Sequence, residues 1–335
     1  MPAAQPGPSG DPGATDPVES PDRRDGLVYV LQDEVDLAVD VALATGRPLL
    51  LRGDPGSGKS SLAPYIARQR EWRYYEKVVS ARTQATELLW TYDHVRRLSD
   101  AQVHARGRAL ADDDRYLVPG PLWWAFAPGS AAAVQAAGRR GAGAGRALPP
   151  QADPNDGRSV DHAVVLVDEI DKADPDLPNG LLVPLGSNEF TVSETGRRVA
   201  KEPPRTPGGL DGSGSRHLIV ITTNEERELP QAFLRRCVVA WLPEHDKERL
   251  VSIAEAHLRH SFGDFCAADR QLAEALADEL VRARQDARKQ ALRMPSTAEY
   301  LDALRACRAL GIRTSDSQWE LLKRLVLLKP QQPER

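Results

Sequence analysis

The feature that most constrains this chain is a glycine-rich loop between a short apolar run and a helical pattern. The apolar run 49–51 leads into residues 53–60, whose sequence GDPGSGKS matches the pattern GxxxxGK[ST]. In that pattern the glycines let backbone N–H groups turn inward around phosphate oxygens, and the following helix N-terminus adds a partial positive charge. The chain is therefore expected to fold around a phosphate-binding loop held between a strand and a helix.

Two side chains at the end of this loop have the chemistry that a nucleoside triphosphate requires. Lys59 can reach the β- and γ-phosphates, and the hydroxyl of Ser60 can bind Mg²⁺. We therefore predict ATP and Mg²⁺ as cofactors, with Lys59 also taking part in catalysis. The predicted nucleotide-binding residues are those of the loop and the first helical turn: Gly53, Asp54, Pro55, Gly56, Ser57, Gly58, Lys59, Ser60 and Ser61.

Short apolar runs alternate with helical patterns along most of the chain. The runs have strand length and lie at 49–51, 78–79, 164–167, 218–221 and 238–242. Between most of them apolar residues recur at helical spacing, as they do over 35–43. This alternation is typical of an α/β fold with a mainly parallel sheet. After Pro243 four helix-like segments follow, the last two beginning at S-x-x-E capping patterns at Ser296 and Ser317.

Composition predicts the domain organisation. Residues 1–25 are rich in Pro, Gly, Ser and Asp and are predicted to be a disordered tail. An α/β nucleotide-binding domain is predicted over 26–243 and a small all-helical domain over 244–330, with the boundary near 242–246. Within the first domain a stretch of about 130–160, rich in Ala, Gly and Arg, lacks strong periodicity and is predicted to be a flexible insertion.

Two adjacent acids follow the apolar run 164–167. A buried strand has no structural use for Asp168 and Glu169 at its end, whereas ligands bind at that end of the strands in open α/β sheets. We predict that Asp168 holds Mg²⁺ and that Glu169 polarises the attacking water as the base of phosphoryl transfer. Asn224, at the polar end of another apolar run, is predicted to orient that water, with a loop-capping role as the alternative. The charged residues that follow the acidic pair are interpreted as surface charges: Asp171 and Lys172.

Composition also narrows the class of protein. The 335 residues carry a formal net charge of −4, and the absence of a basic run argues against a nucleic-acid partner. No apolar run approaches the roughly 20 residues of a membrane helix, and the N-terminal residues lack the apolar segment of a secretion signal. We therefore expect a cytoplasmic protein without a membrane partner. The three cysteines are far apart, so neither a zinc site nor a disulfide framework is expected.

Four motifs stand in order along the chain: GDPGSGKS at 53–60, VVLVDEID at 164–171, ITTN at 221–224 and LPQAFLRRC at 229–237. Together they resemble the AAA+ ATPases, and more closely the MoxR-type branch of that family. Further stretches are similar to the same branch: RPLLL at 47–51, PGPLWWA at 119–125 and DEIDKA at 168–173. The resemblance spans roughly residues 28–310.

The resemblance implies properties that residue spacing alone does not. AAA+ proteins pair an α/β nucleotide domain with a helical lid and form rings, often hexamers, with ATP between neighbouring subunits. One subunit supplies an arginine finger to its neighbour's site, and Arg236 matches that position, with Arg235 as the alternative. The lid often carries a second sensor arginine, for which Arg293 is the nearest candidate. The family commonly places this arginine after a proline, where Thr297 stands here.

The same resemblance implies an insert between the loop and the acidic pair. The long interval from Lys59 to Asp168 leaves room for the hairpin-like insert of the MoxR-type branch, to which we assign residues 120–127. The adjacent Trp123 and Trp124 either pack in the core, which we favour, or contact a client protein in a ring pore. By the same resemblance, residues 28–31 are expected near the adenine.

The leading hypothesis is a MoxR-like ATPase that remodels or activates a partner protein, and related ATPases often act with von Willebrand factor A-type partners. The alternative is an ATP-gated scaffold or signalling switch with slow hydrolysis, as in bacterial conflict systems. A nucleic-acid motor similar to clamp loaders lacks support from any basic run. A GTPase is disfavoured because no NKxD motif for guanine is present.

Overall fold

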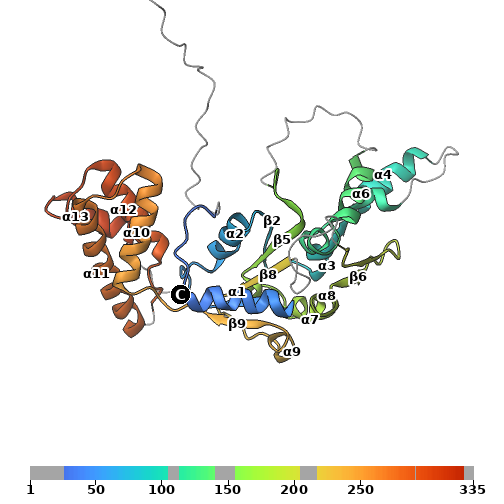
Figure 1. Cartoon of the computed structure of the whole chain (residues 1–335), viewed down its shortest axis with the longest axis horizontal. Coiled ribbons are helices and arrows are strands. Elements are labelled where there is room, and N and C mark those ends of the chain that lie inside the picture. The colour runs from blue at the N-terminus through green and yellow to red at the C-terminus, as the bar shows by residue number, and fades with distance from the viewer. Residues whose placement is uncertain (1–25, 105–112, 140–154, 204–216, 291, 328–335) are drawn as a thin grey trace, which may run out of the picture.

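The computed structural model describes residues 26–104, 113–139, 155–203, 217–290 and 292–327. An α/β part and a helical part lie side by side. Figure 1 shows the helices α10 to α13 grouped at one end of the molecule, the sheet in the middle, and α4 and α6 at the opposite end. The predicted tail over residues 1–25 lies outside the described residues.

Within the described residues, five parallel strands form the central sheet in the order β2-β5-β8-β1-β9. In chain order they are β1 (Leu49–Arg52), β2 (Trp72–Val78), β5 (Ser159–Asp168), β8 (His217–Thr223) and β9 (Val238–Trp241). Because the strands are parallel, their carboxyl ends lie along one edge, where β8 separates β1 from β5. This sheet and the helices around it confirm the predicted α/β fold.

The strands β1 and β8 lie inside the sheet and are covered on both faces. Leu49 and Leu51 pack on one face and Leu50 on the other, because successive side chains of a strand point to opposite sides. All residues of β8 are buried. Strands covered on both faces consist of continuous apolar runs. This explains why residues 49–51 and 218–221 show no polar alternation in the sequence.

Two sets of helices cover the faces of the sheet. The helices α1 (Asp33–Thr45) and α2 (Lys59–Gln69) share a hydrophobic core with the face that contains Leu49 and Leu51. The core on the other face is shared by α3 (Ala85–Leu89), α5 (Pro121–Phe126), α7 (Asp176–Gly180), α8 (Leu182–Ser187) and α9 (Gln231–Leu234). The smaller elements are β3 (Trp90–Tyr92) paired with β4 (Leu117–Pro119), β6 (Glu189–Thr191) paired with β7 (Arg198–Ala200), η1 (Asp113–Tyr116) and η2 (Ile170–Lys172).

The segment between β2 and β5 includes α4 (His94–His104) and α6 (Pro128–Arg139) and contributes its tryptophans to the core. Trp123 has 0% exposed surface and packs edge to face on Phe190, with ring centroids 5.6 Å apart. Trp124 is partly exposed and stacks on Tyr75. The core interpretation therefore holds for Trp123, whose ring is not accessible to a client protein.

The structure differs from two expectations about local structure: it contains a helix that was not predicted and a strand that begins earlier than expected. Residues 128–139, partly within the stretch of about 130–160 predicted to be a flexible insertion, form α6, in which Ala131 and Val134 are buried. Alanine is the strongest helix former, so a helix arises here although the apolar periodicity is weak. Residues 140–154 of that stretch lie outside the described part. The strand expected at 78–79 is β2, which begins at Trp72 because aromatic residues favour strands.

The C-terminal helices build a separate hydrophobic core. They are α10 (Lys247–Phe262), α11 (Ala267–Gln290), α12 (Thr297–Leu310), α13 (Gln318–Leu322) and a π-helical turn (Lys323–Leu327). Leu276, Leu280, Tyr300 and Leu304 are fully buried among them. This second core confirms the predicted helical portion, whereas the boundary near 242–246 stays a prediction. Among the described helices, none is long and apolar enough to cross a bilayer.

One of the two predicted capping boxes forms. The hydroxyl of Ser296 accepts a hydrogen bond from the backbone N–H of Glu299, whose carboxylate accepts the backbone N–H of Ser296 at 2.8 Å. Ser317 already has helical backbone angles, φ −60° and ψ −24°, and makes no capping hydrogen bond. A helical residue cannot bring its hydroxyl over the next turn as an extended cap residue does, so α13 begins directly after Ser317, as predicted, but without the capping hydrogen bond.

The two adjacent tryptophans provide a test of the core. Trp123→Ala removes a fully buried ring and should lower the free energy of unfolding by about 3–5 kcal/mol. Trp124→Ala, at the partly exposed neighbouring position, is the matched control and should cost clearly less. Chemical denaturation of both variants measures the difference. Equal destabilisation by the two substitutions would contradict the placement of Trp123 in the core.

Candidate functional site

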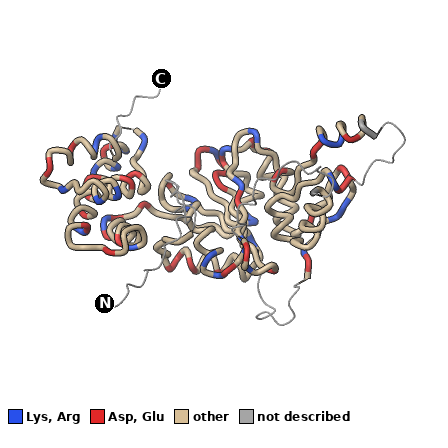
Figure 2. Tube along the Cα trace, turned by 90° about the horizontal axis from the view of Figure 1, so that it is seen from above, with Lys and Arg blue, Asp and Glu red and all other residues tan. Residues whose placement is uncertain are grey.

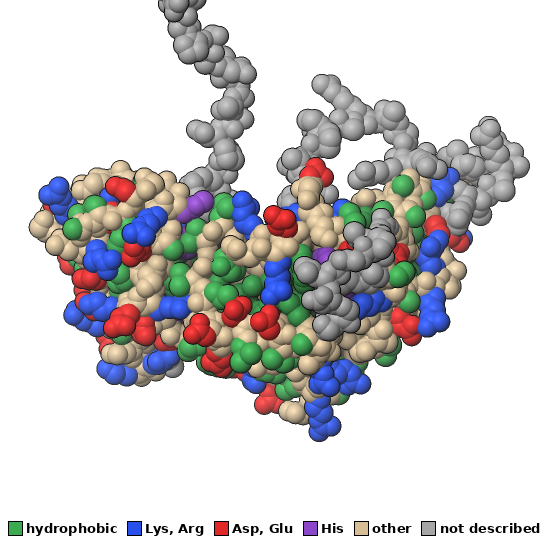
Figure 3. Space-filling view, viewed as in Figure 1, with side chains coloured by type: hydrophobic (Ala, Val, Ile, Leu, Met, Phe, Trp, Pro, Cys, Tyr) green, Lys and Arg blue, Asp and Glu red, His purple; other side chains and the backbone are tan. Residues whose placement is uncertain are grey.

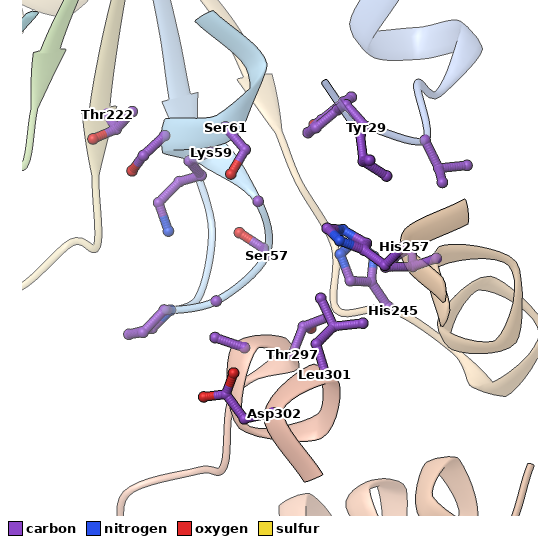
Figure 4. Close-up of a pocket in the computed structure, with 18 of the residues that line it drawn as sticks. Tyr29, Ser57, Lys59, Ser61, Thr222, His245, His257, Thr297, Leu301 and Asp302 are labelled. Atoms are coloured by element: carbon purple, nitrogen blue, oxygen red, sulfur yellow. The ribbon is translucent and has the colours of Figure 1, made fainter. Parts of the chain in front are cut away.

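A cavity of about 390 Å³ lies between the α/β part and the C-terminal helices. One wall consists of the glycine-rich loop and the ends of β5 and β8, and the other consists of α10 and α12. The N-terminal segment 28–30 and the connection at His245 close the remaining sides. Figure 4 shows Lys59, Ser57 and Thr222 on one side of this space and Thr297, Leu301 and Asp302 on the other.

The glycines of the loop are required by its backbone and by its contacts. Gly53, Gly56 and Gly58 have φ angles of 144°, 80° and 87°, a region that other residues rarely adopt. A Cβ atom at Gly53 would stand 2.4 Å from the carbonyl oxygen of Leu242, and one at Gly56 would stand 2.6 Å from the Cβ of Ser296. The loop therefore packs against the residue that follows β9 and against the start of α12. Its shape depends on these tertiary contacts in addition to its own backbone angles.

Lys59 is held under the loop at the first position of α2. Its side chain is buried, and its Nζ donates hydrogen bonds to the carbonyl oxygens of Gly53 and Asp54 at 2.6 and 2.8 Å. Burial lowers the pKa of Lys59, while the charge of Asp54 opposes that shift. The ammonium group is therefore fixed beneath the loop, where a phosphate group held by the loop amides would meet it.

Asp168 joins three elements at the carboxyl edge of the sheet. This carboxylate, almost fully buried at the end of β5, accepts hydrogen bonds from the Ser60 hydroxyl at 2.6 Å and the Thr222 hydroxyl at 2.7 Å, both through Oδ1. A carboxylate beside a hydroxyl is an oxygen donor set that suits Mg²⁺, which normally keeps several waters and takes few protein ligands. Among the described residues, no group of three or more His, Cys, Asp or Glu could hold a metal ion.

Glu169 is held by the strand next to its own. Its backbone has a φ of 60°, and its N–H donates to the hydroxyl of Thr222 at 2.9 Å. One carboxylate oxygen accepts from Lys172 Nζ at 2.8 Å and the other from Asn224 Nδ2 at 3.4 Å. Glu169, Thr222 and Asn224 all line the cavity. The predicted base and the predicted water-orienting amide are therefore brought together.

Asp171 is not the surface charge that the sequence suggested. It has 3% exposed surface, and its Oδ2 accepts hydrogen bonds from the backbone N–H groups of Asn224 at 3.2 Å and Glu226 at 2.9 Å. This carboxylate ties the turn after β5 to the loop after β8 and so positions Asn224. Lys172 is partly exposed and pairs with Glu169. The sequence did contain a signal for the burial of Asp171: it is the third acid, after Asp168 and Glu169, close to the end of a buried strand.

Comparison with known proteins identifies the family of this chain. Residues 48–237, more than half of the chain, match the family model described as AAA domain (dynein-related subfamily). The chain belongs to that family. A solved structure from Cytophaga hutchinsonii, described as a candidate ATPase, is also similar; its TM-score is 0.42 at 15% sequence identity, covering 86% of this chain and 77% of that one. No curated protein matches the sequence.

Membership of the AAA family confirms the prediction of an AAA+ ATPase at the level of the family. The cavity of this AAA protein also contains residues for which the sequence predicted no role. On the helical side they lie on α10, on α12 and in the connection before α10: His245, Ile253, His257, Thr297, Ala298, Leu301, Asp302 and Arg305. They share no motif, because three separate segments supply them. Only the packing of the helical part on the loop brings them together.

The predicted arginines lie away from the chain's own cavity. Arg293 pairs with Glu299 at 3.1 Å and is not among the lining residues. Arg236 is exposed at the end of α9, where its Nη1 donates to the Ala232 carbonyl oxygen at 2.8 Å. Arg235 is also exposed, and its backbone carbonyl accepts a hydrogen bond from the Arg47 guanidinium. Their assignments as sensor and finger stay predictions.

Asp171 provides a test of how the AAA site is positioned. Asp171→Ala leaves two backbone N–H groups without their acceptor and frees Asn224, so ATP turnover should fall about tenfold or more. Nucleotide affinity should change little, because the phosphate loop is untouched. Steady-state ATPase assays and fluorescent nucleotide titration measure the two effects. Asp176→Ala, at a nearby exposed acid, is the control, and equal turnover of the two variants would contradict the positioning role.

His245 should make stability depend on pH. Burial and the charges of Arg249 and Arg284 lower the pKa of His245 from 6.5 to about 4, although Asp246 acts in the opposite direction. Between these values the unfolded chain takes up a proton that the folded chain does not, so folding stability should fall as the pH drops from about 6.5 to about 4.

The measurement is the thermal midpoint across that pH range. His245→Gln removes the imidazole and should reduce the fall of the thermal midpoint with decreasing pH. His260→Gln, at an exposed position of α10, should show the same fall as the wild type. An unchanged slope in His245→Gln would show that this imidazole is not shifted by its surroundings.

Proposed function

We propose that this chain is a MoxR-like AAA+ ATPase that binds and hydrolyses ATP with Mg²⁺ and uses the cycle to remodel or activate a partner protein. One observation carries the proposal. A single cavity is lined by the glycine-rich loop, Lys59, Ser60, Glu169 and Asn224, with Asp168 directly behind Ser60. This arrangement contains the positive charge, the metal donors and the base that phosphoryl transfer requires.

Each residue has a role that follows from its position. The loop amides and Lys59 bind the phosphate groups, and Ser60 and Asp168 would hold Mg²⁺. The metal ion would supply neutralisation of the charge that develops on the phosphate oxygens. Glu169 accepts the proton of the attacking water, and Asn224 orients that water from the end of β8. The closeness of Asn224 to Glu169 supports this division of roles.

Assembly into a ring, often a hexamer in related proteins, is part of the proposal. Arg235 and Arg236 are exposed at the end of α9, outside the lining of their own cavity. An arginine in that position can serve a nucleotide only in a neighbouring subunit. We assign the finger to Arg236, which stands just before Cys237 at the position that the resemblance implies, with Arg235, also exposed, as the alternative.

The partner is proposed to be a client or effector protein, with von Willebrand factor A-type proteins as the leading class by the MoxR resemblance. A nucleic-acid partner is not supported by the charges. Lys and Arg alternate with Asp and Glu along both parts of the chain, and the face seen in Figure 3 has no continuous basic area (Figures 2 and 3). A cytoplasmic location, where ATP is available, completes the proposal.

A second candidate function is an ATP-gated scaffold with slow hydrolysis. The observation that favours it is the state of Glu169, both of whose carboxylate oxygens already accept hydrogen bonds from Lys172 and Asn224. A base held in this way has to exchange one of these donors for water before it can act. Native mass and ATPase rate, measured together with and without Mg·ATP, separate the two functions: assembly with turnover supports remodelling, and assembly without turnover supports the scaffold.

Two substitutions separate binding from hydrolysis. Lys59→Ala removes a charge-assisted contact to the phosphates and should weaken ATP binding about 10- to 100-fold. Glu169→Gln keeps the shape of the side chain but not the base, so binding should persist while turnover falls about 10²- to 10⁴-fold. Titration with a fluorescent nucleotide and a phosphate-release assay measure these effects. Unchanged affinity in Lys59→Ala would exclude the loop as the phosphate site.

Mixed assemblies test the finger. Arg236→Ala should bind ATP normally but hydrolyse it about 10³-fold more slowly, because the charge at the neighbouring site is lost. Mixing Arg236→Ala with Glu169→Gln should restore part of the activity, since some interfaces then combine an intact base with an intact arginine. Arg235→Ala is the matched control. Failure of the mixture to recover activity would exclude action of Arg236 in trans.

A further inference from the structure

Lys172 holds the carboxylate of the proposed base. Its Nζ donates a hydrogen bond to Oε2 of Glu169 at 2.8 Å, whereas the amide of Asn224 reaches Oε1 only at 3.4 Å. The shorter bond also joins opposite charges, and such bonds are roughly twice as strong as those between neutral groups. Of the two donors, Lys172 therefore has the stronger influence on how the Glu169 carboxylate is oriented.

A tight turn brings Lys172 back onto Glu169. The backbone of Glu169 has a φ of 60°, η2 follows it, and the N–H of Lys172 donates to the carbonyl oxygen of Glu169 at 3.0 Å. Glu169 lines the cavity, but Lys172 is not among the lining residues, and 41% of its side chain is exposed. The ammonium group can therefore leave the carboxylate on the solvent side, without crossing the space of a nucleotide.

A second acid acts on the same ammonium group. The hydrogen bond to Glu169 raises the pKa of Lys172, and the charges of Glu226 and Asp171 act in the same direction, while burial opposes them. Asp171 is buried and accepts the backbone N–H of Glu226 at 2.9 Å, which fastens the loop after β8 beside η2. The carboxylate of Glu226 is exposed and makes no hydrogen bond or ion pair with any described residue. Glu226 is therefore free to accept Lys172.

The other acids of that loop do not offer the same partner. Glu225 already forms an ion pair with Arg52. Glu228 is exposed, but it is not among the charges that act on Lys172. Among the acids of this loop, Glu226 is thus the one whose position and charge suit a second site for Lys172.

We propose that Lys172 is a positioning residue with two partners: paired with Glu169 it keeps the base from the attacking water, and paired with Glu226 it releases the base for hydrolysis. The proposal rests on the ATPase function proposed above. A general base must hydrogen-bond the water whose proton it accepts. Movement of Lys172 to Glu226 explains how a carboxylate with both oxygens occupied at rest can still act as that base.

The first test compares turnover with the affinity for nucleotide. Lys172→Met removes the ammonium group, so kcat should rise about two- to fivefold, the size of a partly exposed ion pair. KM for ATP should stay within about twofold, because Lys172 does not line the cavity. Lys172→Arg keeps the charge and can bind a carboxylate through two N–H groups, so its kcat should equal or fall below that of the wild type. Lys289→Met, at an exposed lysine of α11, is the matched control.

The second test examines the release site by a double-mutant cycle. Glu226→Gln removes the second partner and should lower kcat about two- to fivefold, whereas Glu228→Gln, the matched control, should leave it unchanged. The double variant Lys172→Met/Glu226→Gln should have the kcat of Lys172→Met alone, because Glu226 acts only through Lys172. Additive effects of the two substitutions, or an unchanged kcat in Glu226→Gln, would overturn the assignment of Glu226.

The outcomes of these assays are distinct. An unchanged or lower kcat in Lys172→Met would overturn the proposal, as would an equal rise of kcat in Lys172→Arg, because the charge would then not be what holds the base. A chain that binds ATP but releases no phosphate, either as the wild type or as Lys172→Met, would overturn it as well. A wild-type chain that does not bind ATP would instead remove the proposed function itself.

Discussion

The site depends on one buried carboxylate, that of Asp168. Its Oδ1 accepts from Ser60, at the start of α2, and from Thr222, at the end of β8, while its own strand supplies Glu169. A buried ionised group is tolerated only when hydrogen bonds satisfy it. The two hydroxyls therefore stabilise Asp168, and Asp168 in turn sets the spacing between the phosphate loop and the central strands. Any shift of β5 against β8 would break this arrangement.

A second set of hydrogen bonds positions the residues that are proposed to react. Thr222 bonds both Asp168 and the backbone of Glu169, and Asp171 holds the loop that contains Asn224. Each of these links crosses between strands that are far apart in sequence. The proposed base and the proposed water-orienting amide are thus held by residues that contact neither nucleotide nor water in the proposed mechanism. Such support is what keeps catalytic groups within the narrow range of productive positions.

The helical part completes the cavity and has a hydrophobic core of its own. Its core is built from its own helices, and it contacts the α/β part at the connection near His245, at the start of α12 and through Arg249, which donates to the carbonyl oxygen of Val30. A part with its own core can move as a unit about such a connection. Arg284 of α11 lies where that connection and α12 meet, and it donates hydrogen bonds to both.

The sequence by itself determined the order of elements and the local motifs. The alternation of short apolar runs with helical patterns predicted the mainly parallel sheet, and the GxxxxGK[ST] pattern predicted the loop, because both are patterns of residues close together in the chain. The acidic pair and Asn224 followed from the strand ends for the same reason. The helix α6 was missed because alanine supplies helix propensity without marking a buried face.

Only the tertiary structure decided which charged residues are buried and which helical residues face the nucleotide site. Asp171 looks like a surface acid in the sequence, and Arg284 looks like any other arginine on a long charged helix. Their burial depends on elements more than ten residues away, and in Asp171's case more than fifty. No local pattern records such contacts, because the burial of a charge is a property of the packed chain and not of its neighbours in sequence.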